Sequence, residues 1–464
     1  MVAHVPVIPH DTTRGSSPRI VIRKGASLSF PRSKACARAR VRKLLLRSFR
    51  MENGAKASET FRWSEELWEP STLALTGVPK RARRAARIKA YVPAGLAERS
   101  FSLDAEAVQA VIDAQDAVRE AQQYADTVGV NTIAQQLLRS EAIASSQIEG
   151  IDVPGHRALA KAAAGNQHKR GAQLALANIE AVRWVYDWAA SNSDPFSPEV
   201  ICEIHRRLAT ADRHLSAHAG QIRTRQNWIG RDAYTSVGVD FIPAPARVVP
   251  ELLQDLCAYA DRDDIAPVIQ AAAVHAQFET IHPFADGNGR VGRSLIGAVL
   301  ARRQICRDVV PPVSLVLSRD RDAYINALTT WRFETDGHSQ CIVELATACE
   351  AAALASTRLA GRVAGLQDRW RDAAGHPRRD SAAAAIIDAL PAYPILDAGS
   401  AAALTGRSEV AARQALNSLT DSGVLEQVTV GKRNRVWESV GLFALIDEME
   451  RELSAGLRGP AGTQ

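Results

Sequence analysis

The chain has 464 residues, 46% of them hydrophobic and 23% charged, which is typical of a globular protein with room for about three domains. No apolar run approaches the roughly 18 residues of a membrane-spanning helix, and the six cysteines show no Cys-x-x-Cys spacing. These features argue against a membrane protein, a zinc site and a disulfide scaffold. We expect reduced thiols and a cytoplasmic protein.

The net charge of +6 is unevenly distributed along the chain. Residues 1–50 hold twelve of the 57 Lys and Arg residues but one of the 51 Asp and Glu residues, so the rest of the chain is mildly acidic. Residues 1–55 lack a sustained hydrophobic period, and Met51 directly follows their basic run. We interpret them as a disordered basic arm or a misassigned start, and their Arg-rich, acid-poor composition leaves a transit peptide open.

Apolar residues at helical spacing predict a mainly helical chain. The first predicted helices cover residues 103–126, 131–149, 173–191, 197–209, 248–261 and 266–280. Residues 220–245 instead combine short extended segments with a glycine-containing turn, which predicts a β-hairpin. The helix over 131–149 ends at Glu149, where a carboxylate meets the negative end of the helix dipole.

A base, a carboxylate, a glycine-flanked turn and two cations fall together between His282 and Arg293. We expect the turn Gly287-Asn288-Gly289 to take positive φ and to present free N–H groups at the start of a helix over 290–302. Such a helix start is an anion site.

Two further features of this stretch favour phosphate chemistry. Arg290 and Arg293 lie three residues apart on the predicted helix, so both can point at the same anion. We expect His282 to be extended because a proline follows it, and to approach the anion from the other side of the turn.

The stretch resembles the motif of the Fic family, His-x-Phe-x-(Asp/Glu)-Gly-Asn-Gly-Arg-x-x-Arg, and matches it at every fixed position. The resemblance covers about residues 100–350. It implies an all-helical enzyme, bacterial and cytoplasmic, that transfers AMP from ATP to a Ser, Thr or Tyr hydroxyl of a target protein. In this family the predicted hairpin would be a flap that holds the target segment by strand-like main-chain bonds. From its residues alone, an edge hairpin that covers the core is equally compatible.

The resemblance also implies a role for each motif residue, with ATP and Mg²⁺ as the cofactors. His282 would be the general base and Asp286 the Mg²⁺ ligand. Gly287, Asn288 and Gly289 would hold the phosphates of the nucleotide. Arg290 and Arg293 would neutralise the charge that gathers on the pyrophosphate leaving group.

Two alternatives remain open at this point. One is another Fic-type transfer, of phosphate or of a different nucleotide. The other is a DNA-binding regulator with a sensor-like Fic core.

The end of the helix over 131–149 carries a second resemblance. Ser145-x-x-x-Glu149-Gly150 is similar to the inhibitory-helix motif of Fic proteins whose inhibitor precedes the core. This resemblance implies that Glu149 pairs with Arg293 and keeps the γ-phosphate of ATP from its productive position. Without the resemblance, Glu149 would be interpreted as a solvated surface residue.

The predicted elements after residue 320 form a separate group. A helix opens at Asp320, where we interpret Tyr324, like His275 before it, as a packing residue. A long helix over 341–370 leads to a polar joint at 374–380. Helices over 382–390, 400–404 and 408–421 then precede two strands around Gly431-Lys432-Arg433-Asn434-Arg435.

This C-terminal order of elements predicts a winged helix-turn-helix at 376–445. Its basic wing would suit a phosphate backbone, and Arg413 and Asn417 on the third helix are candidate readers of base edges. Residues 376–438 hold seven basic and seven acidic residues, which weakens this interpretation. DNA binding through 376–440 and a scaffold or protein-docking role therefore both stay open, as does a homodimer.

Together these patterns predict an all-α fold, with a Fic-type helical bundle, a β-hairpin flap and a C-terminal winged-helix domain. After the arm, we expect an N-terminal helical region at 56–150 that ends in the inhibitory helix. The Fic core would follow at 151–350 and a helical linker at 351–375.

Overall fold

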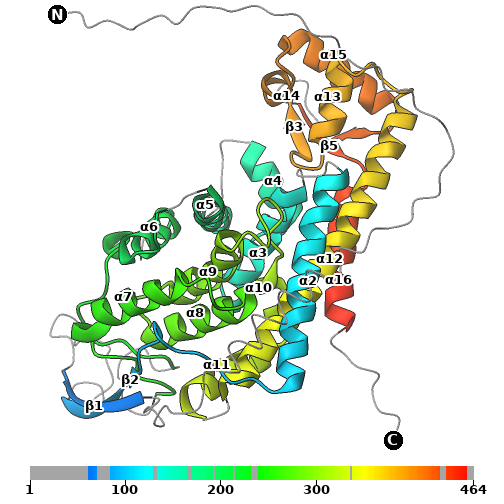
Figure 1. Ribbon diagram of the computed structural model, residues 1–464. Coiled ribbons are helices and arrows are strands. Elements are labelled where there is room, and N and C mark those ends of the chain that lie inside the picture. The colour runs from blue at the N-terminus through cyan, green and yellow to red at the C-terminus, as the bar shows by residue number, and fades with distance from the viewer. Residues whose placement is uncertain are drawn as a thin grey trace, which may run out of the picture. The chain divides into compact units, whose positions relative to one another are not determined.

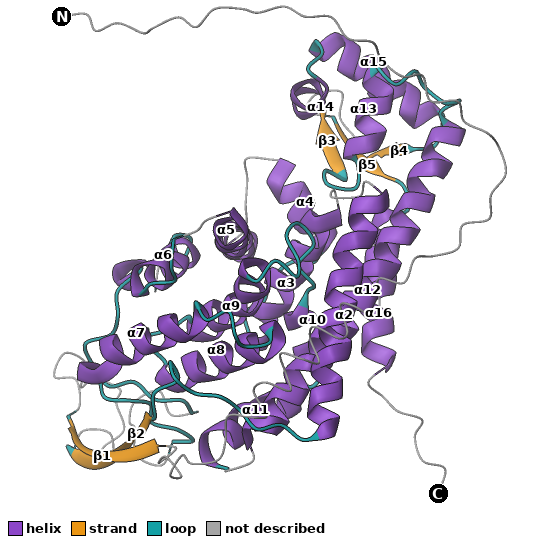
Figure 2. Ribbon diagram, viewed as in Figure 1, coloured by secondary structure: helices purple, strands orange, loops and turns teal. Residues whose placement is uncertain are grey.

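The computed structural model describes residues 61–69, 84–128, 133–164, 170–191, 194–212, 215–230, 239–334, 337–428 and 435–456. The predicted arm at 1–55 and the wing residues Lys432 and Arg433 lie outside these ranges. The described part is mostly helical, with two small antiparallel sheets (Figure 1, Figure 2), and this confirms the predicted fold class.

Two helices form the centre of the fold. Every residue of α8 (Pro267–Ile281) is buried, and so is every residue of α9 (Asn288–Arg302) except the last. Their sequences are rich in Ala, Val, Leu and Ile on all sides, and such helices are stable only when neighbours surround them. The loop 282–287 that joins them carries the motif, so it is held between two buried elements.

The remaining core helices cover this pair. They are α5 (Arg170–Ser191), α6 (Pro198–Ala209), α7 (Val249–Ala260) and α11 (Arg321–Phe333), with α3 (Ala134–Ile148) and α10 (Val313–Leu317) packed on each other beside α9. The helix α4 (His156–Ala164) follows α3 and packs on α5. The short helices α4 and α10 were not predicted, because a few apolar residues define no clear helical period.

The long helix α12 (Gly337–Ala373) packs along α2 (Ala105–Val128), and the two run side by side in Figure 1. It differs from the predicted organisation, because it passes without a break through the expected core boundary at 350 and the expected linker at 351–375. Buried residues such as Leu345, Leu359 and Val363 recur along its whole length, so the core and the linker share one helix.

The N-terminal region corrects another expectation. The sequence predicts helical structure over 56–150, but the described part begins with an antiparallel sheet of β1 (Phe61–Trp68) and β2 (Ala86–Pro93). Cross-strand aromatic packing stabilises the sheet, since Phe61 and Trp63 both contact the ring of Tyr91. The two strands are separate segments of the chain, so the helical period of the sequence that follows them gave no sign of their pairing.

The C-terminal module, defined here as residues 381–456, combines four helices with a three-stranded sheet. Its elements are α13 (Ala382–Ala389), β3 (Ile395–Asp397), α14 (Ala398–Thr405), α15 (Glu409–Asp421), β4 (Leu425–Gln427), β5 (Val436–Ser439) and α16 (Leu442–Gly456). The strand order is β3-β5-β4, all antiparallel. Arg413 and Asn417 are exposed on α15, and their contact with DNA stays a prediction.

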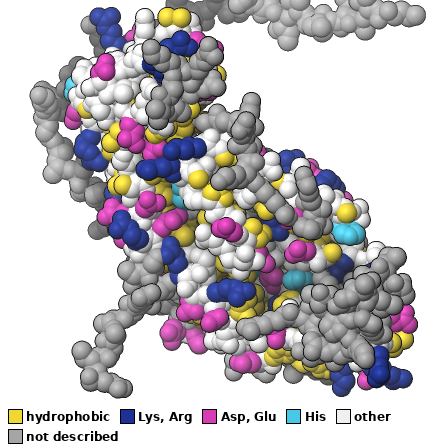
Figure 3. All heavy atoms as spheres, turned by 180° about the vertical axis from the view of Figure 1, so that it is seen from behind, with side chains coloured by type: hydrophobic (Ala, Val, Ile, Leu, Met, Phe, Trp, Pro, Cys, Tyr) yellow, Lys and Arg dark blue, Asp and Glu magenta, His cyan; other side chains and the backbone are white. Residues whose placement is uncertain are grey.

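The described residues of the predicted hairpin form one antiparallel bridge, between Ile229 and Phe241, and residues 231–238 lie outside the description. Basic and acidic side chains are interspersed over the face seen in Figure 3, as expected for a part of the chain whose charge is close to balanced. In the described ranges no helix has both the length and the apolar character that crossing a membrane requires.

Candidate active site

The candidate base, His282, ends α8 in a left-handed conformation (φ 51°, ψ 63°) instead of the extended one expected before a proline. A non-glycine residue is strained there unless its surroundings hold it. Its amide still donates to the Phe278 carbonyl at 2.9 Å. Its own carbonyl accepts from Arg223 Nε at 2.9 Å and from the Asn227 side-chain amide at 3.3 Å, so three hydrogen bonds override the local preference.

Arg223 holds the motif loop from the base of the predicted hairpin. Its backbone N–H donates to the Pro283 carbonyl at 2.9 Å, and its buried guanidinium also donates to the carbonyls of Ile281 and Ala244. These bonds tie the hairpin base to the end of α8. The motif loop therefore depends on a residue about sixty positions earlier in the chain.

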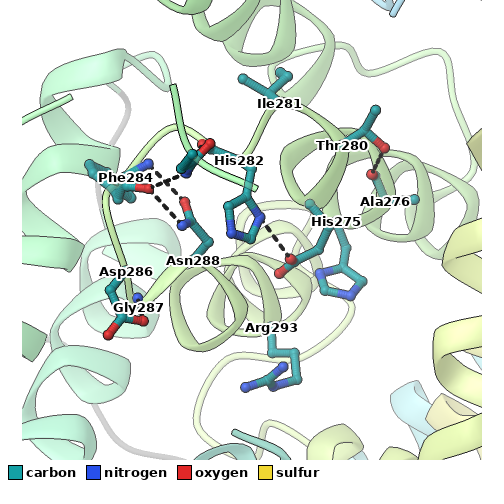
Figure 4. A network of polar contacts seen from close by, with 12 residues as sticks. His275, Ala276, Thr280, Ile281, His282, Phe284, Asp286, Gly287, Asn288 and Arg293 are labelled. Carbon is teal, nitrogen blue, oxygen red and sulfur yellow. Dashed lines mark hydrogen bonds and ion pairs between the residues drawn. The ribbon is translucent and has the colours of Figure 1, made fainter. Parts of the chain in front are cut away.

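Asn288 fixes the other half of the loop. Its side-chain oxygen accepts from the Phe284 N–H at 2.8 Å, and its amide donates to the Phe284 carbonyl at 2.9 Å (Figure 4). The ring of Phe284 is buried and stacks on His205, with centroids 4.0 Å apart. Because the Asn288 side chain is used within the loop, a bound phosphate would meet backbone N–H groups at this position.

The glycine-flanked turn is tighter than expected. Of its three residues only Gly287 is left-handed (φ 78°), and α9 already begins at Asn288, two residues earlier than predicted. The backbone of Gly289 is thus part of the first helical turn, where N–H groups lack partners within the helix. The anion site is a helix start preceded by one left-handed glycine.

Asp286 suits the expected metal role. Its side chain is exposed, and one carboxylate oxygen accepts from the Gly287 N–H at 2.6 Å. Within the described ranges no group of three or more His, Cys, Asp or Glu residues could hold a metal ion. A single carboxylate fits Mg²⁺, which usually binds one or two carboxylates and completes its shell with water and substrate phosphates.

Arg293 lies deep in the site, with 1% of its side chain exposed. Its Nε donates to Ser145 Oγ at 3.0 Å, and one terminal nitrogen donates to the Ser145 carbonyl at 2.7 Å and to Glu149 Oε1 at 2.8 Å. Burial opposes the charged form, but Tyr324 and Glu149 more than offset it and raise the pKa of Arg293. The guanidinium therefore stays charged and is held by the end of α3.

The carboxylate of Glu149 occupies the helix start itself. A Cβ placed on Gly289 would collide with Glu149 Oε1, so this oxygen lies directly over the first turn of α9. Burial by itself would raise the pKa of Glu149, but Arg293 outweighs it and the pKa is lowered. The ionised carboxylate thus sits where the sequence predicts an anion.

Arg290 is the second cation at the helix start. Its side chain is buried, and its Nε has no hydrogen-bond partner among the described residues. Burial lowers its pKa from the usual arginine value, although the charged form persists. A buried guanidinium N–H without a partner is costly, and a phosphate oxygen would satisfy it. Together with the helix start at Gly289, the buried guanidinium of Arg290 fits the phosphates of a nucleoside triphosphate.

The side chain of His282 is largely buried, with 18% of it exposed. Burial is the main cause that lowers the pKa of His282 to about 3, and the nearby cations Arg332 and Arg223 add to it. The imidazole is therefore neutral at physiological pH. Its Nδ1 lies 3.8 Å from Glu279 Oε2, and this contact is drawn as the dashed line at the ring of His282 in Figure 4.

His275 and Tyr324 pack on each other, and Tyr324 also interacts electrostatically with Arg293. Both are buried, their rings stack at a centroid distance of 5.8 Å, and His275 Nε2 lies 3.0 Å from the Tyr324 hydroxyl.

Known proteins have sequences similar to the part of the chain that forms this site. Residues 195–300 match the Fic/DOC family, and they include the whole stretch from His282 to Arg293. Among curated relatives, the chain is similar to the protein adenylyltransferase fic-1 of Caenorhabditis elegans, 33% identical over 135 residues, which are 28% of this chain and 23% of the relative. It is also similar to the probable protein adenylyltransferase aq_aa38 of Aquifex aeolicus, 37% identical over 92 residues, which are 20% and 26%.

The chain thus spans about a quarter of the length of these two relatives. A solved structure of a Fic family protein from Desulfovibrio desulfuricans G20 is 21% identical, with a TM-score of 0.46, and covers 74% of this chain and 98% of that one.

Sequence reasoning missed the residues that hold the motif loop from outside. These are Arg223, Asn227 and His205, which reaches the carbonyl of Asp286 at 3.2 Å and accepts from the Gly220 N–H at 2.9 Å. No periodicity distinguishes Arg223 from the exposed Arg225 two residues later. One weak signal was available, since polar residues at the base of a predicted hairpin next to a motif often brace a loop.

Replacing Arg223 by Ala should lower the free energy of unfolding by about 1–3 kcal/mol, because several buried carbonyls lose a charged donor. Urea unfolding followed by circular dichroism measures this change. Arg225→Ala is the matched control, and it should stay within about 0.5 kcal/mol because that side chain is exposed. Equal stability of the two variants would mean that Arg223 does not support the loop.

Proposed function

We propose that this chain, which carries a Fic/DOC-family domain at residues 195–300, is an autoinhibited protein adenylyltransferase that transfers AMP from ATP to a hydroxyl side chain of a target protein. The observation that carries the proposal is the arrangement of His282, an exposed Asp286 and a buried Arg290, whose Nε lacks a partner among the described residues, around one helix start. The printed names of the curated relatives support the same reaction.

In the proposed reaction the acceptor oxygen forms a bond to the α-phosphorus of ATP. The bond from that phosphorus to the pyrophosphate oxygen breaks, and His282 Nε2 takes the hydroxyl proton. Backbone N–H groups at Gly289 and the guanidinium groups of Arg290 and Arg293 would bind the phosphate oxygens. Asp286 would hold Mg²⁺, which, when bound, neutralises phosphate charge.

The position of Glu149 supports the proposed autoinhibition. Its carboxylate lies over Gly289 and accepts from Arg293, so it takes both the space and the cation that a terminal phosphate of ATP needs. A nucleotide could still bind through Arg290, but with its phosphates displaced from the productive position. Activation then requires that the end of α3 leaves Arg293.

The catalytic roles are tested in a Glu149→Gly background. His282→Ala should lower transfer by about 10² to 10⁴-fold and leave ATP affinity nearly unchanged, because the base acts on the acceptor. Asp286→Ala should also weaken Mg²⁺-dependent ATP binding, measured by calorimetry. Retention of transfer within about tenfold by His282→Ala would remove His282 as the general base.

Autoinhibition is tested by the label that reaches protein from ATP in a cell lysate. Glu149→Gly should raise labelling from α-labelled ATP by about tenfold or more over the wild type, because it frees Arg293. Glu149→Gln should act in the same direction but less fully, since the amide keeps the bulk and loses the charge. Adding Arg293→Ala to Glu149→Gly should suppress the gain.

The same assay separates the alternatives. Transfer of AMP retains the α-label, whereas transfer of phosphate would retain only the γ-label. Equal labelling by the wild type and by Glu149→Gly would show that Glu149 does not inhibit the enzyme.

A further inference from the structure

Glu279 is a buried carboxylate one helical turn before His282. Its side chain is 7% exposed, and its Oε2 lies 3.8 Å from His282 Nδ1. Neither Nδ1 of His282 nor Oε1 of Glu279 has a hydrogen-bond partner among the described residues. A buried polar atom without a partner costs free energy until it is paired, and the Glu279 carboxylate approaches Nδ1 of His282 through its other oxygen, Oε2.

The space for this carboxylate is provided by Gly292 on α9. A Cβ at Gly292 would collide with Glu279 Oε1 and would lie 2.9 Å from the ring of Phe278. The glycine between the two motif arginines thus lets the side chain of Glu279 fit between α8 and α9.

The charges around the pair explain why the base needs a partner. Arg332 and Arg223 face His282 and, together with burial, keep its pKa near 3, although Glu149 and the Glu279 carbonyl oppose them. Burial also raises the pKa of Glu279 to about 7, although Arg293 and Arg332 oppose this effect and Glu149 adds to it. An imidazole so disfavoured as a cation accepts a proton only if a nearby anion stabilises it.

We propose that Glu279 is the positioning residue of His282, an assignment that rests on the proposed adenylyl transfer. Its carboxylate accepts a hydrogen bond from the Nδ1–H of His282, which leaves the Nε2 lone pair facing the acceptor hydroxyl. The carboxylate also stabilises the imidazolium that forms when Nε2 takes the proton. The pair closes from 3.8 Å to hydrogen-bond length when substrates fill the site, as catalytic contacts often do.

The test compares Glu279→Gln and Glu279→Asp in the Glu149→Gly background. Glu279→Gln should lower kcat by about 10²-fold with the KM for ATP within about twofold, since the nucleotide does not touch Glu279. Glu279→Asp should recover part of the loss. In the parent, kcat should rise with pH as Glu279 loses its proton, at a pH below 7 because the charge of Glu149 no longer raises the pKa of Glu279, and this limb should vanish in Glu279→Gln.

A kcat within about threefold of the parent with an unchanged pH profile in Glu279→Gln would overturn the assignment. Equal losses in Glu279→Gln and Glu279→Asp, with lowered melting temperatures, would also overturn it in favour of a structural role. Absence of transfer from the Glu149→Gly parent itself would instead refute the proposed function, and the tautomer of His282, read by NMR above pH 7 where Glu279 is ionised, then decides the pairing. The Nδ1–H tautomer would support the pair, and the Nε2–H tautomer would exclude it.

An independent observation concerns the other side of the helix that carries Glu149. On one face of α3, Ser145 and Glu149 hold Arg293, and the buried Glu141 accepts from the N–H of Ser314 at 2.8 Å and from its hydroxyl. The spacing of four residues aligns these three side chains. This face joins α3 to α9 and α10.

The opposite face of α3 binds the C-terminal module. Gln136, which is buried, donates to the Pro391 carbonyl at 2.7 Å, and Ser140 donates to Glu450 Oε1 on α16 at 3.5 Å. Oε1 of Glu450 also lies 3.0 Å from Nε2 of His156. His156 is buried and is the first residue of α4. The module therefore contacts both the inhibitory helix and the segment that follows it.

We infer that the C-terminal module is a clamp that keeps α3 in the inhibitory position, an inference that rests on the proposed autoinhibition. Because α3 is held on both faces, displacing Glu149 from Arg293 requires that the contacts at Gln136 and Glu450 also yield. Anything that moves α16 or the segment 391–392 then shifts α3 and changes the occupancy of Arg293 by Glu149.

The chain offers matched controls for the clamp. Glu450→Gln and Gln136→Ala, with Glu149 intact, should raise target labelling by about 5- to 30-fold and speed amide hydrogen exchange in α3. Glu448→Gln and Glu452→Gln should change neither, because those carboxylates pair with Arg362 of α12. In the Glu149→Gly background, Glu450→Gln should add nothing.

Unchanged exchange in α3 of Glu450→Gln, or labelling as low as the wild type while Glu149→Gly is active, would refute the clamp. If Glu149→Gly is itself no more active than the wild type, autoinhibition fails and the clamp loses its function with it. Faster exchange together with higher labelling, absent from both controls, would support it.

Discussion

The guanidinium of Arg293 has 1% of its surface exposed, and an unpaired cation in such a place would cost several kcal/mol of stability. The structure meets this constraint with Ser145 and Glu149, which lie about 145 residues earlier in the chain. The pairing determines where α3 ends and what fills the helix start at Gly289. It also means that any bound anion which replaces Glu149 must satisfy Arg293 equally well, as a phosphate group can.

Burial shifts the pKa values of the titrating groups around the motif in opposite directions. Burial lowers the pKa of His282 and raises that of Glu279 and of Glu141, because it disfavours whichever form is charged. Each group then depends on the few partners within its reach, since a low local dielectric strengthens those contacts and removes the alternative of water. The site is therefore sensitive to single substitutions that keep the shape of a side chain and change its charge.

The motif loop is positioned largely from outside the motif. Arg223 and Asn227 hold its first half through backbone carbonyls, and His205 supports Phe284 and the carbonyl of Asp286. Such backbone bonds fix the path of the loop without restricting its side chains. They leave Asp286 exposed to solvent while His282 is largely buried, which separates the proposed metal ligand from the proposed proton acceptor.

The sequence by itself determined the identity of the motif residues and most of the helices, because apolar spacing and the start and stop residues of helices are local properties. It placed α5 to α9 within a few residues of their observed ends, and it identified Glu149 through a resemblance to a known pattern. Tertiary structure decided the rest. The left-handed His282 contradicts the preference of a residue before proline because hydrogen bonds from Arg223 and Asn227 outweigh that preference.

Contacts between distant segments had no signature in the one-dimensional pattern, and neither did the degree of burial. Nothing local distinguishes Arg223 from Arg225, or reveals that Gly292 makes room for Glu279 and that Glu450 reaches α3. Those facts depend on distances through space, and spacing along the chain specifies such distances only within one helix or one turn.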